Sequence, residues 1–134
     1  MFNGPKKLKF KKTKKGKLVK FEFKNNKLSF GTFGLKAAEA GIINSYQIEA
    51  ARQSIARKTK RKSKTWIKIF PSLPITSKPT GVRMGKGKGT LSHWGARVRG
   101  GTVLFEICGA NSNILISALK TAGAKLPIRT KIFQ

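Results

Sequence analysis

A run of eight residues in the second half of the chain has a pattern suited to binding phosphate groups. This Gly–Lys loop, residues 82–89, alternates glycine with lysine. Alternate glycines permit positive φ and remove side-chain bulk, so backbone N–H groups and lysine amines can approach a phosphate strand closely. The spacing matches neither GxxxxGK[ST] nor GxGxxG, so it does not predict nucleotide binding. The alternative is a connector without a ligand. The candidate residues are Arg83, Met84, Gly85, Lys86, Gly87, Lys88 and Gly89.

Positive charge is concentrated in three segments. Thirty Lys and Arg residues stand against four acids, a formal net charge of +26, and 23 of these cations fall within residues 1–27, 52–64 and 83–99. A surface that serves only solubility mixes charges of both signs. The clusters therefore indicate a polyanion, and nucleic acid is favoured because each neutralised phosphate releases a counterion. The candidates in the first two segments are Lys6, Lys7, Lys9, Lys11, Lys12, Lys14, Lys15, Arg52, Arg57, Lys58, Lys60, Arg61, Lys62 and Lys64.

Few residues of this chain are suited to catalysis or to metal binding. His93 is the single histidine, Cys108 is the single cysteine, and the four acids are scattered glutamates. General acid–base catalysis needs two titratable groups within reach of each other. The sequence therefore predicts no enzymatic activity, no cofactor, no metal site and no disulfide. Cys108 lies in an apolar run and is expected to be a buried, unreactive thiol.

Two helices are predicted from apolar residues at helical spacing. The first begins after Asn44, where Gln47 completes a capping box, and its inward face runs from Ile48 to Ile55. Arginines and lysines of the second segment lie on and just beyond its C-terminal end. The second helix covers residues 113–124. Its buried stripe is predicted to contain Ile114, Leu115, Ala118, Leu119 and Ala122.

Short alternating segments predict strands around these helices. A hairpin is expected to close around Gly100 and Gly101, and the chain from Pro71 to Pro79 is expected to be a long non-helical connection. Interspersed strands and helices without regular βαβ spacing indicate an α+β fold. We expect one domain over residues 28–134, preceded by a basic N-terminal extension, residues 1–27, that orders only against a polyanion. The predicted strands cover residues 18–23, 30–35, 65–70, 94–98, 102–108 and 128–133.

Seven stretches occur in the order found in one known family and cover nearly the whole chain. From Pro5 to about Phe133 the sequence resembles the bacterial and organellar family of large-subunit ribosomal protein number sixteen. Between residues 17 and 27 the chain departs from the family, because it is Lys-rich where the family usually has glycine and arginine. The stretches that carry the resemblance are PKKLKF (5–10), FGTFGLKA (30–37), QIEAAR (47–52), WIKIFP (66–71), PITSKP (74–79), VRMGKGKG (82–89) and AKLPIRT (124–130).

The resemblance implies an α+β hammerhead-like fold with two helices packed on antiparallel strands. It implies partners: large-subunit rRNA, tRNA at the aminoacyl site and neighbouring ribosomal proteins. The Gly–Lys loop is then expected near tRNA, and the other two basic segments on rRNA. The function implied is architectural, because peptide transfer belongs to the RNA.

Two other classes of protein share the charge of this chain. A basic protein that packages DNA would not require the seven ordered stretches, and a membrane-surface protein would show a long helix with basic and apolar faces. No run of about 18 apolar residues is present to span a bilayer. The bias toward Lys, Asn, Ile and Phe, and an N-terminus without a typical presequence, favour an organelle-encoded mitochondrial protein. A plastid or bacterial origin is the alternative.

Overall fold

The computed structural model describes residues 4–7, 10–16, 18 and 20–134. Within these residues the chain forms two helices and seven strands, with antiparallel pairing throughout, so the α+β prediction is confirmed. The elements, in chain order, are β1 (Phe33–Ala37), β2 (Gly41–Asn44), α1 (Ser45–Lys58), β3 (Lys64–Ile67), β4 (Leu73–Ser77), β5 (Thr90–Val98), β6 (Val103–Cys108), α2 (Ser112–Gly123) and β7 (Thr130–Phe133).

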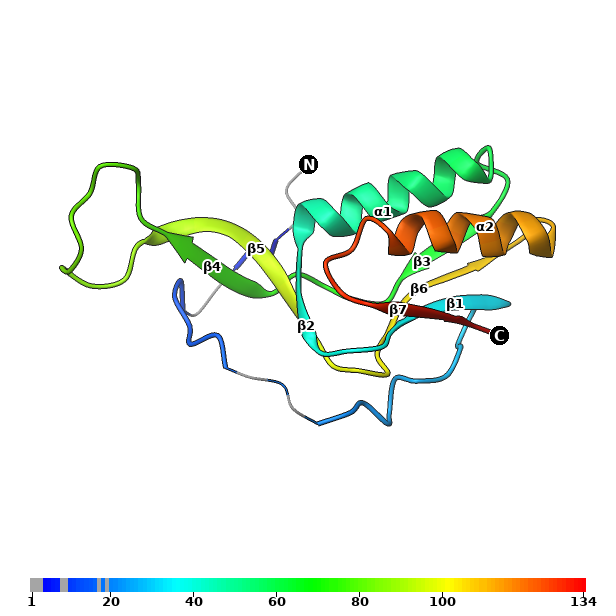
Figure 1. Ribbon diagram of the computed structural model, residues 1–134, viewed down its shortest axis with the longest axis horizontal. Helices are drawn as coiled ribbons and strands as arrows, with labels where there is room; N and C mark the ends of the chain where they lie inside the picture. The colour runs from blue at the N-terminus through cyan, green and yellow to red at the C-terminus, as the bar shows by residue number, and fades with distance from the viewer. Residues whose placement is uncertain (1–3, 8–9, 17, 19) are drawn as a thin grey trace.

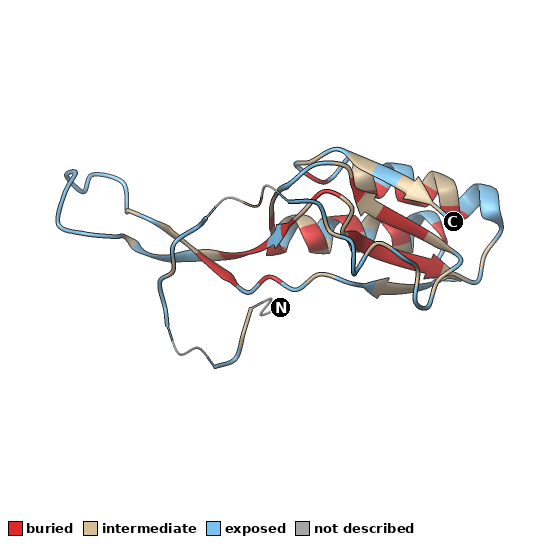
Figure 2. Ribbon diagram, turned by 90° about the horizontal axis from the view of Figure 1, so that it is seen from below, coloured by how far each residue is buried: buried red, intermediate tan, exposed pale blue. Residues whose placement is uncertain are grey.

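The body of the molecule is a four-stranded sheet with both helices on one face. Its strand order is β3-β6-β1-β7, and α1 and α2 lie side by side above it (Figure 1). Leu35 and Phe105 from the sheet pack against Ile55 and Leu119 from the helices in one apolar core. Buried residues accordingly concentrate between the helices and the sheet (Figure 2).

A three-stranded sheet, in the order β2-β5-β4, carries a long hairpin away from this body (Figure 1). The connection predicted between Pro71 and Pro79 contains no helix, but it includes a strand that was not predicted, because residues 73–77 form β4 and pair with β5. Pro74 stands inside β4, where the missing N–H is tolerated because β4 is an edge strand. β5 also begins at Thr90, four residues before the predicted start at Trp94.

The expected hairpin between residues 94–98 and 102–108 is also wrong. β5 pairs with β2 whereas β6 pairs with β1, so the chain bends between the sheets instead of reversing. The end of β1 lies beside the segment that joins β5 to β6. The Ala37 N–H donates to the Thr102 carbonyl at 2.9 Å, and the Gly101 N–H donates to the Ala37 carbonyl at 2.7 Å. Gly101 has a φ of 92°, which explains the glycine at this bend. One bent antiparallel ribbon therefore joins both sheets.

Both helices lie where the sequence predicted them. The Asn44 N–H donates to Gln47 Oε1 at 2.9 Å, and Ile48, Ala51 and Ile55 are buried. In α2, four of the five predicted stripe residues are buried. Ile114 is 43% exposed, so its assignment to the buried stripe was wrong.

The remaining strands differ from the predictions mainly in length. β1 begins three residues after the start expected at residue 30 and extends two residues past the expected end, to Ala37. β7 lies within the segment expected at residues 128–133 and begins two residues late. β3 stops at Ile67, three residues before its expected end. The strand expected at residues 18–23 is wrong for the described residues, which form no strand there. In this segment the Glu22 N–H donates a backbone hydrogen bond of 2.9 Å to the Gly100 carbonyl.

Candidate nucleic-acid interface

One basic surface lies at the C-terminal end of α1. This helix-end cluster consists of exposed residues from the last turn of α1 to the first residue of β3. The Lys60 and Arg61 backbones have φ of 51° and 61°, which reverses the chain directly after the helix. Thr59, buried at 3% exposure, holds this turn: its Oγ1 donates to the Ile55 carbonyl at 3.0 Å and accepts from Ser63 Oγ at 2.9 Å. The turn is therefore fixed while its cations point to solvent. The cluster comprises Arg57, Lys58, Lys60, Arg61, Lys62 and Lys64.

Arg52 differs from the other candidates on α1 because it has an acidic partner. Its guanidinium donates from Nη2 and Nε to the Glu49 carboxylate at 2.6 and 2.9 Å. The hydrogen bond from Arg52 lowers the pKa of Glu49, against the opposing effect of burial. Part of the Arg52 charge is thus neutralised within the protein, so the helix-end cluster offers the stronger field.

The second helix extends this basic surface. An open groove between the end of α1 and the start of α2 is lined by Lys58, Lys60 and Lys62 together with Asn111, the residue before α2. In a second groove between the helices, Lys125 lies with Arg57 and Lys58. Lys125 was missed because it stands 61 residues beyond the basic segment of the sequence. Only the packing of α1 on α2 brings it there.

The second basic surface is the tip of the β4–β5 hairpin, which contains the Gly–Lys loop. Gly85, Lys86 and Gly87 have φ of 96°, 53° and 83°, so the positive φ expected from alternate glycines is confirmed. A Cβ added at Gly85 or Gly87 would meet no described atom within 4 Å. The backbone is therefore open to a ligand on this side. The Lys78 Nζ donates to the Gly85 carbonyl and ties the loop to its base.

Gly89 has a different role from the other loop glycines. A Cβ there would lie 2.4 Å from the Ser77 carbonyl oxygen, because the two hairpin strands approach closely where the loop closes. Met84 beside the tip is 92% exposed. The loop thus has an open tip above a tightly packed neck.

The N-terminal segment runs along this hairpin. Lys12 Nζ donates to the Lys88 carbonyl at 2.8 Å, Lys88 Nζ donates to the Thr13 carbonyl at 2.5 Å, and Arg97 Nη1 donates to the Lys15 carbonyl at 2.7 Å. Lys9 lies outside the described residues. These backbone contacts leave the N-terminal amines as unneutralised charge, so extension and hairpin form one basic surface rather than two. The other candidates on this segment, all exposed, are Lys6, Lys7, Lys11 and Lys14.

Figure 1 shows that the two basic surfaces lie at opposite ends of the molecule's long axis, with the helix end at one side and the hairpin tip at the other. Three segments of the sequence thus make two surfaces. Among residues 4–7, 10–16, 18 and 20–134, no group of three or more His, Cys, Asp or Glu side chains is placed to hold a metal ion. In the same part of the chain no helix has the length and apolarity to cross a membrane.

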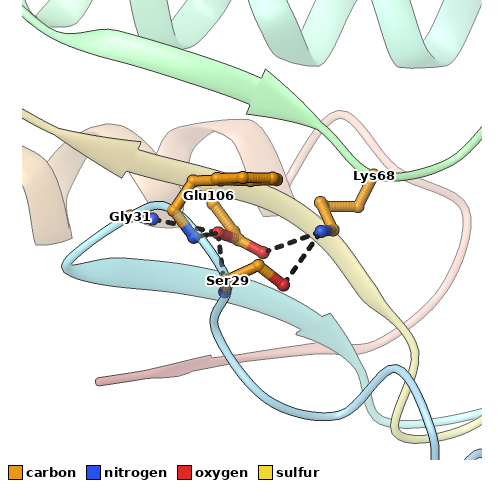
Figure 3. A network of polar contacts seen from close by, with 5 residues as sticks. Ser29, Gly31, Lys68 and Glu106 are labelled. Atoms are coloured by element: carbon orange, nitrogen blue, oxygen red, sulfur yellow. Dashed lines mark hydrogen bonds and ion pairs between the residues drawn. The ribbon is translucent and has the colours of Figure 1, made fainter.

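A buried carboxylate fixes the segment that enters β1. Glu106, in the middle of β6, is fully buried, and its Oε2 accepts hydrogen bonds from the backbone N–H groups of Ser29, Phe30 and Gly31 at 3.1, 2.7 and 3.0 Å (Figure 3). Its Oε1 lies 3.5 Å from Lys68 Nζ. Burial raises the pKa of Glu106, but the three N–H donors and the Lys68 charge outweigh it, so the pKa lies below its usual value.

Comparisons with known proteins give a consistent result. The sequence model of the family described as ribosomal protein L16p/L10e matches residues 5–133. A protein of Orientia tsutsugamushi (strain Boryong) named large ribosomal subunit protein uL16 is 51% identical over 130 residues, which cover 97% of this chain and 96% of that protein. The protein of the same name from Methylorubrum extorquens (strain PA1) is 48% identical over 130 residues, covering 97% and 95%.

Proposed function

Because this chain belongs to the ribosomal protein L16p/L10e family, we propose that it binds large-subunit rRNA through the helix-end cluster and the N-terminal segment, and that its Gly–Lys loop helps to hold tRNA at the aminoacyl site. The chain is a structural constituent of the large ribosomal subunit and not an enzyme. Its partners are ribosomal RNA and other ribosomal proteins.

The observation that carries this division of roles is the contrast between the two ends. The helix-end cluster stands on a turn fixed by Thr59, which suits an RNA surface that stays in place. The Gly–Lys loop has an exposed backbone with three successive positive φ values, which suits a partner that arrives and leaves. Arg52 remains a candidate for rRNA binding, with its charge shared with Glu49.

The boundary between extension and domain is part of the proposal. We place it at residues 27 and 28, with residues 1–27 as the extension and 28–134 as the domain. Hydrogen bonds from the Glu22 N–H to the Gly100 carbonyl and from the Val103 N–H to the Asn25 carbonyl support a short docked portion at the end of the extension.

We also propose a mitochondrial ribosome as the location, on the bias toward Lys, Asn, Ile and Phe. The relatives named above are bacterial proteins, which favours the alternative of a bacterial cytoplasmic ribosome. Fractionation of source cells into organelles and cytoplasm, followed by detection of this chain in the ribosome pool of each, decides between them.

Co-sedimentation tests the assembly itself. The chain is expected at one copy per large subunit after centrifugation in high salt. A DNA-packaging protein would follow the DNA instead, and a membrane-surface protein would follow anionic vesicles. Absence of the chain from washed large subunits would contradict the proposed function.

Replacing Lys86 and Lys88 with alanine tests the role of the loop. We expect large subunits that assemble normally but bind aminoacyl-site tRNA about tenfold more weakly, since two exposed cation–phosphate contacts are lost. Filter binding of tRNA to purified subunits measures the effect. Because Lys88 also bonds to the Thr13 carbonyl, Lys86→Ala alone separates loss of the tip cation from loosening of the N-terminal segment.

Lys131→Ala is the matched control, since this exposed lysine lies on β7 in the body of the molecule, away from the hairpin. It should leave tRNA affinity unchanged. If the double variant enters few large subunits, but the subunits that contain it bind tRNA with normal affinity, then the loop serves rRNA binding instead.

A further inference from the structure

The face of the four-stranded sheet opposite the helices carries aromatic rings and lysines together. The strand register places Trp66, Glu106, Gly34 and Phe133 in one row across β3, β6, β1 and β7. The neighbouring row contains Leu35 and Phe105 of the core, so the first row faces away from the helices.

Three rings lie on this outer face, and each has a lysine amine near it. Phe30 lies over the row at Glu106 and stacks on Trp66, with 5.8 Å between ring centroids and 23° between the ring planes. The ring–amine distances are 4.7 Å from Phe30 to Lys68, 5.2 Å from Trp66 to Lys64 and 4.7 Å from Phe133 to Lys36.

Phe30 is anchored through its backbone although the residue as a whole is largely exposed. The residue is 63% exposed, but the Phe30 N–H donates to the fully buried Glu106 carboxylate. The same carboxylate holds Lys68, whose Nζ also donates to Ser29 Oγ at 3.1 Å (Figure 3). Burying a carboxylate is costly, and an exposed ring contributes little to the core. An anchored pair of aromatic rings that keeps exposed surface is pre-organised for a ligand that stacks on it.

Gly31 makes this arrangement possible. A Cβ at this position would lie 2.8 to 2.9 Å from the Ile107 backbone and the Glu106 Cβ. Only glycine therefore lets residues 29–31 lie close enough to β6 for their N–H groups to reach the carboxylate. Gly31 therefore brings the backbone of residues 29–31 close to β6, while the Phe30 residue stays largely exposed.

We propose that this aromatic–lysine face, formed by Phe30, Trp66, Phe133, Lys36, Lys64 and Lys68, stacks unpaired bases of the large-subunit rRNA. Aromatic rings stack on any base, and adjacent lysines pair with the phosphates that flank it. Glu106 is the acid that the register places on this face, and it is fully buried and paired. A protein partner is disfavoured because the cores of protein interfaces are depleted in lysine.

This proposal rests on the proposed rRNA binding and adds a contact of a different kind. The two basic surfaces recognise phosphate charge, which double-stranded and single-stranded RNA both present. The aromatic–lysine face requires bases that are free to stack, so it distinguishes single strands and loops from paired helices. The contribution of the rings to affinity should also depend little on salt, in contrast to that of the lysines on this face and in the clusters.

Fluorescence of Trp66 reports stacking directly. The chain has two tryptophans, so full-length protein carrying Trp94→Phe leaves Trp66 as the single reporter. A ten-nucleotide oligouridylate should quench this fluorescence, and an RNA duplex with the same number of phosphates should quench it much less. Equal quenching by both RNAs, or none by either while binding is detected, would overturn the proposal.

Affinity measurements separate stacking from charge. Phe30→Ala should weaken oligouridylate binding about tenfold and shift the plot of log Kd against log salt without changing its slope. Phe30→Trp should restore binding. Phe70→Ala is the matched control, since Phe70 is 60% exposed and lies outside the described ring stack, and it should change affinity less than twofold. Far-ultraviolet circular dichroism confirms folding, and Phe30→Leu provides a second variant that keeps an apolar side chain but lacks the ring.

Two outcomes oppose the proposal and leave the proposed function intact. Phe30→Ala with unchanged affinity for single-stranded RNA overturns base stacking. The same variant with normal RNA affinity but impaired entry into large subunits indicates a ribosomal protein partner on this face, which also overturns it. Failure of the wild-type chain to bind any rRNA would instead contradict the proposed function itself.

Discussion

Replacing Glu106 with alanine is expected to lower the free energy of unfolding by about 3–5 kcal/mol, chiefly because several backbone donors lose their acceptor at about 1–3 kcal/mol each. These donors are the three backbone N–H groups of residues 29–31, and each one left unsatisfied adds to the cost. Urea denaturation of the free protein, followed by circular dichroism, measures the loss. Glu22→Ala is the control, because its ion pair with Arg99 is more exposed, and it should cost less than about 1 kcal/mol.

The same site predicts how stability depends on pH. The folded-state pKa of Glu106 lies below its unfolded value, so its charge contributes stability above the unfolded pKa of about 4.3, and this contribution is lost as pH falls through the folded pKa. Glu106→Gln keeps the shape without the charge and turns an amide N–H toward Lys68. The difference in unfolding free energy between wild type and Glu106→Gln should therefore be largest near neutral pH and shrink on acidification. A difference that stays constant from pH 7 to pH 3 would show that charge is irrelevant at this site. Few other carboxylates interfere, since the sequence contains only four acids.

Removing three cations from the helix-end cluster is expected to give the second large effect. The wild-type chain should bind rRNA with a log–log salt slope of roughly −7 to −9 if on the order of ten phosphates are neutralised. The triple variant Arg57→Ala, Lys58→Ala and Arg61→Ala should reduce the magnitude of this slope by about 3, since each lost phosphate contact changes it by about 1. Affinity at low salt should fall about a hundredfold, and incorporation into large subunits should fall with it. Titrations of an rRNA fragment at several salt concentrations give both the slope and the affinity.

A charge-matched control separates local contacts from net charge. The variant with Lys120, Arg129 and Lys131 replaced by alanine loses the same three charges from exposed positions outside the helix-end cluster, the N-terminal extension and the hairpin. It should retain a slope within about 1 of wild type. If both triple variants lose the same slope, the protein attracts RNA through its overall charge, and the helix-end cluster has no special role. A wild-type slope near −2 would mean that most cations face solvent.

The sequence predicted the parts of the fold that depend on local chemistry. The start of α1 follows from Asn44 and Gln47, and its buried face follows from residues three and four apart. The sheet pairing was not predictable in this way. Gly100 and Gly101 look like a hairpin turn, yet they serve a bend between two sheets, because β5 finds its partner in β2. Pairing between strands distant in sequence depends on packing that no local pattern reveals.

The residues of the candidate site show the same difference between local sequence patterns and tertiary packing. The Gly–Lys loop and the helix-end cluster are contiguous in sequence, so charge and glycine spacing found them. Lys125 joins the helix-end surface only through the packing of α1 on α2, and the N-terminal segment joins the hairpin only through tertiary contacts. One signal for Glu106 was present: a glutamate inside the apolar run from Val103 to Cys108 must find buried partners or disrupt the strand. Its partners at residues 29–31 lie about 75 residues away.

The helix-end cluster and the hairpin tip lie at opposite ends of one body (Figure 1), so the RNA contacts proposed for them would make this protein a bivalent ligand for RNA. Once one end has bound, the other is confined near its own target, and its effective concentration there reaches the millimolar range. Two contacts that are each weak and salt-sensitive then combine through avidity into a long-lived attachment. One end can release and rebind repeatedly without loss of the protein from the particle. A moving partner at the hairpin is therefore compatible with permanent residence at the helix end.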